Sequence, residues 1–391
     1  MKKVLLIITL FLIAINVNAE ELNISSKSAI LYNQNDGKVL FAQNENEKVQ
    51  IASITKIMTA IVSIEQIDDL DKKITLTSND FKGIAEENLV TAGFAVGQTV
   101  TYRDLLYGLL VKSGAECAKG LVNNITTLDK FVELMNNKVR DLKLNQTSFS
   151  NPIGLDDENN YSTANEVSKI FMYALKNEEF KKIITTDSYT SSDGKLTINN
   201  KIRKNKDVGD YLLGGKTGTT DGAGLCLASI ASKDDVNFLL ITLGAPYDKK
   251  GPHNFEDAKT IYQYYIDNYG YHNIWEKDDV ILSLKTKLLK KDKIDFYPQK
   301  VLKVYLPNSF DKKDLVYKYN GEKIIKFNMK KGQKLGKLDV YYKDEKIASQ
   351  NIVLNEKPSL SILKVLDEYK LFIIIFVVSF LTLIFVKRKL K

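Results

Sequence analysis

Histidine and cysteine are scarce in this chain, which has two of each among its 391 residues. His253 and His272 both lie late in the sequence, and neither has the second histidine and the carboxylate whose spacing would form a zinc site. The scarcity argues against a zinc enzyme and against a hydrolase whose nucleophile depends on histidine. We expect both histidines to be ordinary surface or packing residues.

The two cysteines, Cys117 and Cys226, each lie inside an apolar stretch of the sequence. Apolar surroundings indicate burial, so two buried thiols are our first interpretation. A single disulfide is the alternative, because the geometry that a bridge requires cannot be judged from sequence.

A strong charge of one sign is also missing once the two ends of the chain are set aside. The chain has 56 lysines and arginines against 48 acidic residues, a net charge of +8. Two of these positive charges are Lys2 and Lys3 and four lie in the tail at 387–391, which leaves +2 for residues 20–386. We therefore expect no nucleic-acid partner.

Length and composition predict one to three folded domains and exclude a disordered or collagen-like chain.

The first 19 residues have the form of a secretory signal. Lys2 and Lys3 precede an apolar run at 4–15, and the small residues Val17 and Ala19 follow it. The run is shorter than the ~20 residues that a spanning helix needs. We therefore predict a cleaved signal peptide at 1–19, with a permanent N-terminal anchor as the weaker alternative.

Residues 371–386 are uncharged and lie between Lys370 and the basic tail at 387–391. At ~1.5 Å per residue they extend about 24 Å, and flanking lysines that reach the headgroups can make up the remaining bilayer thickness. We predict a transmembrane helix here, against the alternative of a buried core helix. By the positive-inside rule the tail is cytoplasmic, and the folded part of this single-pass cell-membrane protein faces the outside.

Residue patterns between these ends predict strands first, then a helical block, then strands and a closing helix. Alternation at 29–32 and 39–42 around Asp36-Gly37 predicts a hairpin, and the apolar runs 224–232 and 236–243 predict an antiparallel pair near a sheet centre. Periodicity and capping patterns predict helices at 53–67, 101–111, after Gly114, 129–142, 163–175 and 254–269. This order is typical of an α+β fold with an antiparallel sheet covered by helices.

The composition shifts at about residue 275, after which lysine-rich segments alternate over short stretches such as 301–306, 338–342 and 347–354. We predict a first domain at 20–272 and a separate small all-β domain at 276–357. Residues 359–369 would link this β domain to the membrane span.

With histidine scarce, lysine is the remaining candidate to activate a serine. A buried lysine, or one beside another cation, has a lowered pKa and can accept a serine proton. Ser53 and Lys56 have the spacing i and i+3 at the start of a predicted helix, which places them on one face near exposed backbone amides. Alone, this S-x-x-K pattern is weak, since a helix cap at Ser53 would explain it.

Two further motifs accompany the first one. They are Ser113-Gly114-Ala115, between two predicted helices, and Lys216-Thr217-Gly218, placed at the start of the strand pair. Taken singly, the first of these motifs could be a helix C-cap, and the second could be an ordinary lysine at the start of a strand. Together with SITK, they resemble the motif set of the penicillin-recognising serine hydrolases.

The stretches around these motifs look like the D-alanyl-D-alanine carboxypeptidases, the low-molecular-mass penicillin-binding proteins. The resemblance covers residues 24–270, with a less specific match at 276–357, and implies a β-lactamase/transpeptidase-like fold. By this resemblance three residues would be catalytic: Ser53 as nucleophile, Lys56 as base and Ser113 as proton relay. Three would bind the substrate carboxylate: Lys216, Thr217 and Thr219. The backbone amides of Ser53 and Thr219 would form the oxyanion hole.

One position departs from the family pattern. The second motif is commonly S-x-N, and here its third residue is Ala115, followed by Glu116. Losing the asparagine amide costs a hydrogen bond worth ~1 kcal/mol or more, which weakens binding without removing the nucleophile. We expect Glu116 to be a solvated helix residue rather than a substitute for that amide, and we leave both residues out of the predicted site.

The resemblance implies a serine-type D-Ala-D-Ala carboxypeptidase that trims peptidoglycan stem pentapeptides, is acylated by β-lactams and needs no metal or organic cofactor. A β-lactamase or a D,D-endopeptidase of the same superfamily is one alternative, although the loop 151–161 has no convincing carboxylate motif for rapid deacylation. A non-catalytic wall-binding protein, with Ala115 marking decay of the site, is the other.

Overall fold

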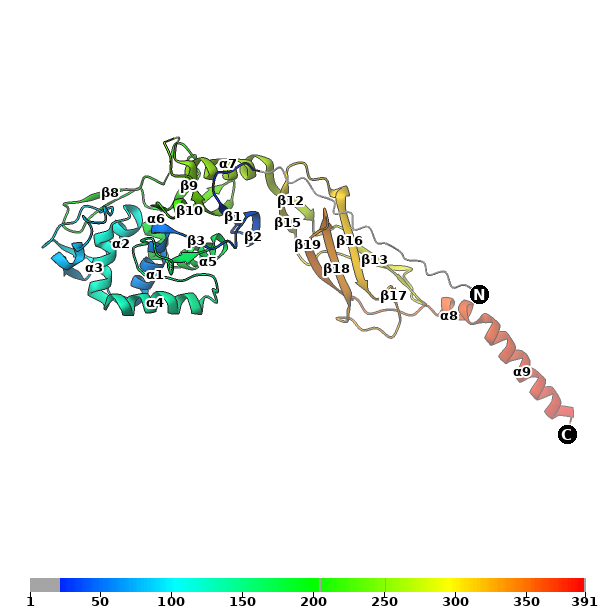
Figure 1. The fold of residues 1–391 in the computed structure, drawn as a ribbon. Helices are drawn as coiled ribbons and strands as arrows, with labels where there is room; N and C mark the ends of the chain where they lie inside the picture. Colours follow the sequence, from blue (N-terminus) through cyan, green and yellow to red (C-terminus); the bar gives the residue numbers. More distant parts are fainter. Residues whose placement is uncertain (1–21, 204, 250, 390–391) are drawn as a thin grey trace, which may run out of the picture. The chain divides into compact units, whose positions relative to one another are not determined.

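The computed structural model describes residues 22–203, 205–249 and 251–389, so the predicted signal peptide at 1–19 lies outside them. The chain divides into two compact units between Ile266 and Asp267 (Figure 1). Each unit has a hydrophobic core of its own, and each is described by itself.

The first unit is built on a five-stranded antiparallel sheet with the strand order β2-β1-β11-β10-β9. The strands are β1 (Ser28–Asn33), β2 (Lys38–Gln43), β9 (Leu212–Thr220), β10 (Gly224–Lys233) and β11 (Val236–Ala245). The predicted hairpin and the predicted central pair, β10 and β11, are confirmed. The motif Lys216-Thr217-Gly218 differs from its predicted place, because it lies within a strand of its own, β9, at the edge of the sheet.

Helices fill the chain between β2 and β9. They are η1 (Ala52–Thr55), α1 (Lys56–Gln66), η2 (Ser78–Phe81), α2 (Tyr102–Val111), α3 (Ala115–Ile125), α4 (Leu128–Asp141), α5 (Ala164–Ala174) and α6 (Glu178–Ile184). Short strands pair as β3 (Val49–Gln50) with β6 (Tyr161–Ser162), β4 (Lys73–Thr75) with β5 (Thr99–Thr101), and β7 (Ser188–Thr190) with β8 (Thr197–Asn199). The predicted caps are present: the Thr101 hydroxyl accepts from the Asp104 amide, and the Thr163 hydroxyl accepts from the Glu166 amide.

Helix α1 lies in the centre of the first unit, since every residue from Lys56 to Ser63 is buried. Around it pack the apolar sides of α2, α3 and α5 and one face of the sheet, to which alternate residues of β11 such as Leu239 and Ile241 contribute. Both cysteines are buried and unbridged, which confirms the first interpretation of them.

Helix α7 (His253–Asn268) covers the other face of the sheet. Its Tyr262 is fully buried, packs against Phe238 of β11 and shares a hydrogen bond of 2.9 Å with the hydroxyl of Ser229 on β10. Because Phe238 and Ser229 alternate with residues of the α1 side, the sheet is covered by helices on both faces, as an α+β fold predicts.

The second unit is a small β structure. Its strands are β12 (Tyr269–Trp275), β13 (Leu282–Thr286), β14 (Lys293–Phe296), β15 (Leu302–Pro307), β16 (Leu315–Gly321), β17 (Ile324–Ile325), β18 (Lys334–Tyr342) and β19 (Glu345–Val353), with the short η3 (Lys312–Asp314) before β16. They form the ladders β12-β15, β14-β13-β17 and β16-β18-β19 around a core that includes Trp275, Phe296 and Val340. Strand β12 pairs with β15, so the second unit takes in residues before 276.

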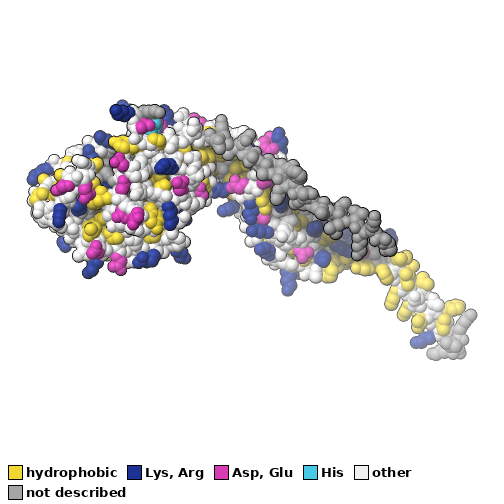
Figure 2. All heavy atoms as spheres, in the orientation of Figure 1, with side chains coloured by type: hydrophobic (Ala, Val, Ile, Leu, Met, Phe, Trp, Pro, Cys, Tyr) yellow, Lys and Arg dark blue, Asp and Glu magenta, His cyan; other side chains and the backbone are white. Residues whose placement is uncertain are grey.

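Two helices end the described chain, α8 (Ile362–Glu368) and α9 (Lys370–Lys389). Within the described residues, one helix, Lys370–Arg388, is long and apolar enough to cross a membrane. It includes the predicted span at 371–386. Figure 2 shows hydrophobic side chains along α9, with none of it buried by protein.

We predict that Ile61→Ala, in the buried centre of α1, lowers the free energy of unfolding of the first unit by about 2–5 kcal/mol, because it leaves a cavity that the packed core cannot close. Urea titration of the detergent-solubilised chain, followed by circular dichroism, measures this. The control Leu128→Ala removes an aliphatic side chain that is 51% exposed on α4 and is expected to change the value by less than about 0.5 kcal/mol. The fluorescence of Trp275 reports the unfolding of the second unit. If Ile61→Ala lowered the free energy of unfolding of the second unit equally, the place of Ile61 in the core of the first unit alone would be contradicted.

Candidate active site

Ser53 and Lys56 are brought together at the join between η1 and α1. Ser53 lies in a 3-10 turn and not in the α-helix predicted to begin there, while Lys56 is the first residue of α1. The residue before the serine, Ala52, has a φ of +46°, a left-handed conformation that is rare for a residue with a side chain. The Lys56 Nζ donates a hydrogen bond of 2.8 Å to the Ser53 Oγ, so the predicted pair is in direct contact.

The Lys56 ammonium has little to stabilise its charge. The residue is 2% exposed, and besides Ser53 its Nζ donates only to the carbonyl oxygen of Ile153, at 2.7 Å, among the described residues. Burial lowers the Lys56 pKa to about 7, against smaller opposing effects from Cys117 and Glu116, which raise it. A neutral amine, able to accept a proton from Ser53, is therefore well populated near neutral pH.

The loop that supplies the Ile153 carbonyl is tightly fixed. The side-chain oxygen of Asn151 accepts hydrogen bonds from the backbone amides of Ile153, Gly154 and Leu155. Gly154 has a φ of +89°, and a Cβ placed there would lie 2.0 Å from the carbonyl oxygen of Ala52. Only glycine at this position lets the loop pack against the turn that carries Ser53. This packing keeps the Ile153 carbonyl oxygen within hydrogen-bond distance of the Lys56 Nζ.

Ser113 and Lys216 form a second pair of the same kind. Ser113, in the link between α2 and α3, also has a left-handed backbone, with a φ of +65°. The Lys216 Nζ donates to its Oγ at 2.9 Å and to the carbonyl oxygen of Thr217 at 2.7 Å. Lys216 is 1% exposed, and burial together with the nearby charge of Lys56 holds its pKa well below the usual range. Residues 103 positions apart in sequence thus meet beside the first pair.

Strand β9 passes close to the nucleophile. A Cβ on Gly218 would lie 3.0 Å from the backbone nitrogen of Ser53, so the strand reaches this nearness only with glycine. Thr217 is half-buried and Thr219 exposed, and in the part of the chain that the structure describes neither hydroxyl is hydrogen-bonded to another protein group. Both hydroxyls are therefore free for a ligand along β9. The amides of Ser53 and Thr219 stay the predicted oxyanion hole.

Glu116 does not have the solvated place expected for it. It is fully buried, and its Oε1 accepts from the amides of Ala92, at 2.6 Å, and Gly93, at 3.0 Å. Its Oε2 is buried without a hydrogen-bond partner among the described residues, and burial raises its pKa. The expectation failed because helix periodicity does not show that the segment 90–94 folds back over α3, where the Ala115 amide donates to the Val90 oxygen.

Acidic residues of the loop 151–161 are held by the sheet or are solvated. The Asp156 carboxylate accepts from the Thr220 hydroxyl and from the Gly222 amide, and so fastens the turn between β9 and β10. Asp157 caps its own loop and is exposed. Across residues 22–203, 205–249 and 251–389, no three histidine, cysteine or acidic side chains are grouped as metal ligands.

Comparison with known proteins bears on both units. The family model described as D-alanyl-D-alanine carboxypeptidase matches residues 15–247, and the model described as Penicillin-binding protein 5, C-terminal domain, matches residues 269–358. The first match covers more than half of the chain.

Individual relatives are similar over most of their length. The chain is 28% identical over 343 residues to the D-alanyl-D-alanine carboxypeptidase DacF of Bacillus subtilis strain 168, covering 85% of each protein. It is 30% identical over 218 residues to a D-alanyl-D-alanine carboxypeptidase of Streptomyces strain K15, covering 51% of this chain and 74% of that one. The fold is similar to penicillin binding protein 5 of Haemophilus influenzae, with a TM-score of 0.64 at 23% identity over 86% of this chain and 98% of that one. The predicted fold class and family resemblance are confirmed.

We predict that Gly154→Ala destabilises the first unit by at least about 2 kcal/mol, because the new methyl group meets the Ala52 carbonyl and adds strain at a positive φ. The matched control is Gly37→Ala, which has a similar φ of +71° but open space around it and should lose only about 1 kcal/mol. Urea unfolding measures both. Equal losses in the two variants would contradict a packing role for Gly154.

Proposed function

The chain belongs to the D-alanyl-D-alanine carboxypeptidase family of serine peptidases, and we propose that it removes the last D-alanine of peptidoglycan stem pentapeptides through an acyl-enzyme on Ser53. The observation that carries this proposal is the contact of two buried lysines with two serines at one place: Lys56 with Ser53, and Lys216 with Ser113.

Acylation begins with the neutral Lys56 amine. It takes the hydroxyl proton of Ser53 across the 2.8 Å contact, and the Oγ bonds to the carbonyl carbon between the two D-alanines. The carbonyl oxygen becomes an oxyanion, which the amides of Ser53 and Thr219 would stabilise. The tight fit of Gly218 against Ser53 supports this assignment, since it brings β9 beside the nucleophile.

Collapse of the oxyanion breaks the peptide bond and requires a proton on the leaving nitrogen. Ser113 is proposed to give its hydroxyl proton to that nitrogen and to be reprotonated through the two lysines. D-alanine leaves, and a water then gives a proton to Lys56 and attacks the ester. The ester bond breaks, Lys56 returns the proton to the Ser53 Oγ, and the shortened peptide leaves.

The terminal carboxylate of the substrate is assigned to β9. The buried Lys216 provides positive charge, and the hydroxyls of Thr217 and Thr219 can donate to a carboxylate. A β-lactam carries a carboxylate and a strained amide in the same relation, so we expect it to acylate Ser53.

Location follows from the two ends of the chain. We infer a signal peptide at 1–19, a catalytic domain that ends at the division at residue 266, a β domain from there to 357, a membrane span at 371–386 and a cytoplasmic tail at 387–391. The apolar helix α9 supports the span, and the basic residues after it support a catalytic domain outside the cell membrane. Peptidoglycan stem peptides are then within reach of Ser53.

We predict that the full chain is labelled by fluorescent penicillin and releases D-alanine from a pentapeptide ending in D-Ala-D-Ala, and that Ser53→Ala abolishes both. The control Ser78→Ala changes an exposed serine of η2 and should keep both activities. Mass spectrometry of the labelled peptide locates the modified residue.

Other outcomes of this experiment separate the alternatives. Fast nitrocefin turnover without stable labelling would indicate a β-lactamase, and cleavage of cross-linked muropeptides without D-alanine release from the pentapeptide would indicate an endopeptidase. Absence of labelling and of any hydrolysis would leave a wall-binding protein.

We predict that the rate of Ser53 acylation by penicillin rises about tenfold per pH unit below pH 7 and levels off above it, because only the neutral Lys56 amine can accept the proton. Burial lowers the pKa of this amine, so the active form appears as pH rises through about 7. A rate that still climbs without levelling above about pH 9 would contradict Lys56 as the base.

A substitution of Glu116 tests the same dependence of the acylation rate on pH. Its negative charge raises the Lys56 pKa, so Glu116→Gln should move the acid limb of the profile to lower pH. Glu158→Gln, on the exposed part of the loop 151–161, should leave the limb in place. A limb that does not move in Glu116→Gln would show that this carboxylate acts only in packing the segment 90–94.

A further inference from the structure

Helix α8 is amphipathic in the reverse sense of an ordinary surface helix. Its polar side faces the loop between β13 and β14 of the second unit: the Lys364 Nζ donates to the Leu289 oxygen, at 2.8 Å, and to the Asp292 carboxylate, at 2.6 Å. Its other side carries Ile362, Leu363 and Leu366, which are 71%, 79% and 50% exposed. A surface helix normally buries its apolar side against the protein, so this face is left for something outside the chain.

Helix α8 and the loop 287–293 are joined by backbone contacts. The Ser361 amide donates to the Leu288 oxygen at 2.8 Å, and the Lys290 amide donates to the Ser359 oxygen at 2.9 Å. An ion pair of 3.1 Å between Lys287 and Glu368 adds to them. The orientation of α8 is therefore fixed by this loop, and the two form one surface.

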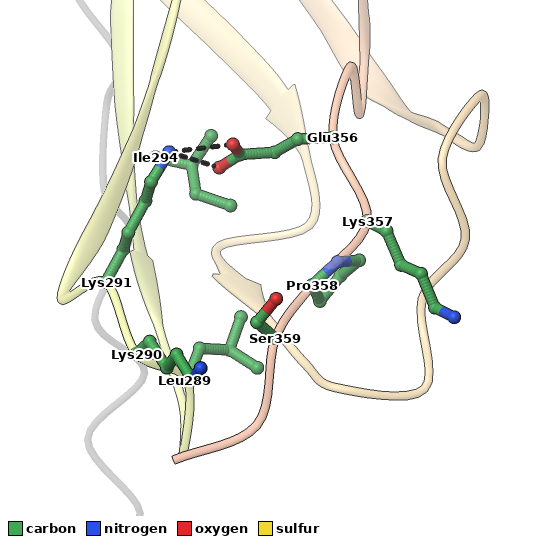
Figure 3. Close-up of a pocket in the computed structure, with 8 residues that line it drawn as sticks. All are labelled: Leu289, Lys290, Lys291, Ile294, Glu356, Lys357, Pro358 and Ser359. Carbon is green, nitrogen blue, oxygen red and sulfur yellow. Dashed lines mark hydrogen bonds and ion pairs between the residues drawn. The ribbon is translucent and has the colours of Figure 1, made fainter.

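The loop 287–293 is strongly basic, with four lysines, at 287, 290, 291 and 293, against the single carboxylate of Asp292. A hollow of about 150 Å³ beside it is lined by residues that include Lys290, Lys291 and Lys357 (Figure 3). The Lys291 Nζ is paired to the Glu356 carboxylate at 2.7 Å. Within the described residues, Lys290 and Lys357 have no carboxylate partner. Unpaired lysines beside an apolar helix face suit a negatively charged, partly apolar partner.

The position of α8 in the chain identifies that partner. Helix α9, which is long and apolar enough to cross a membrane, begins at Lys370, directly after Tyr369 at the end of α8. The Ile373 amide donates to the Tyr369 oxygen, so the first turn of α9 starts there. The exposed face of α8 is thus within a few residues of the point where the chain would enter the bilayer.

We propose that α8 and the lysines at 287–293 and 357 form a lipid-binding surface that docks the second unit on a bilayer with anionic headgroups. Ile362, Leu363 and Leu366 insert among the upper acyl chains, and Lys290 and Lys357 meet headgroup phosphates. The span anchors the chain, while this surface fixes how the second unit stands on the membrane. The inference rests on the proposed anchoring by α9 and does not depend on the catalytic assignments.

The test uses the full chain in vesicles whose acyl chains are brominated near the headgroup, with Trp275→Phe removing the native tryptophan. In this background Leu363→Trp should lose about half of its fluorescence to bromine, because a residue on an interfacial helix lies ~5–10 Å deep. The control Leu128→Trp, on exposed α4 of the first unit, should not be quenched. Quenching of Leu363→Trp no greater than that of Leu128→Trp would overturn the proposal.

The role of charge is tested in the same vesicles with and without anionic lipid. Quenching of Leu363→Trp should be stronger with anionic lipid, and Lys290→Gln with Lys357→Gln should remove the difference. The control is the double variant Lys303→Gln with Lys337→Gln, on β15 and β18, in which the difference in quenching between the two kinds of vesicle should remain. A lipid-charge dependence that survives in Lys290→Gln with Lys357→Gln would overturn the assignment of these lysines.

Failure of the anchoring is recognised separately. Chain that does not sediment with vesicles after an alkaline wash lacks the span, whereas chain that sediments without quenching has the span and lacks the docking surface. Quenching that disappears when the chain is diluted to one copy per vesicle would show that α8 covers a second copy of the chain, and would likewise overturn the proposal. Penicillin labelling of Ser53 is recorded in every variant and reports the catalytic proposal independently.

Discussion

The site depends on keeping the Lys56 amine out of water. Burial at the start of α1 lowers its pKa to about 7, so the amine is available as a base where an exposed lysine would be protonated. Two oxygens fix its direction, the Ser53 hydroxyl and the Ile153 carbonyl. The second of these requires Gly154, and the burial itself requires the helices around α1 and one face of the sheet. The packing of much of the first unit therefore determines the protonation state of Lys56.

Backbone strain is concentrated at the same place. Ala52 and Ser113 are both left-handed at residues with side chains, and each borders a helix that supplies the site. Such conformations cost about 1–3 kcal/mol and persist only where surrounding packing determines them. Here they turn two serines toward two lysines, so a well-packed core holds a strained but prepared site.

Electrostatics link the two lysines with Glu116. The charge of Lys56 disfavours the protonated form of Lys216, while the buried Glu116 carboxylate favours protonation of Lys56. The motif position that commonly has an asparagine is Ala115, and the neighbouring glutamate is directed at the amides of Ala92 and Gly93 instead of at a substrate. The second motif in this chain thus keeps its serine and uses its acidic residue to hold the segment 90–94.

Sequence by itself determined the hairpin, the central strand pair, the capped helices and the family, because these depend on local periodicity, caps and short motifs at residues such as Thr101 and Ser53. It also named the serines and lysines, since histidine was too scarce to provide the base. Only the tertiary structure decided that β9 is an edge strand against Ser53, that Glu116 is buried, and that α8 turns its apolar side outward. Each of these depends on contacts between residues distant in the chain, and desolvation, which sets the pKa of Lys56, exists only once those contacts have formed.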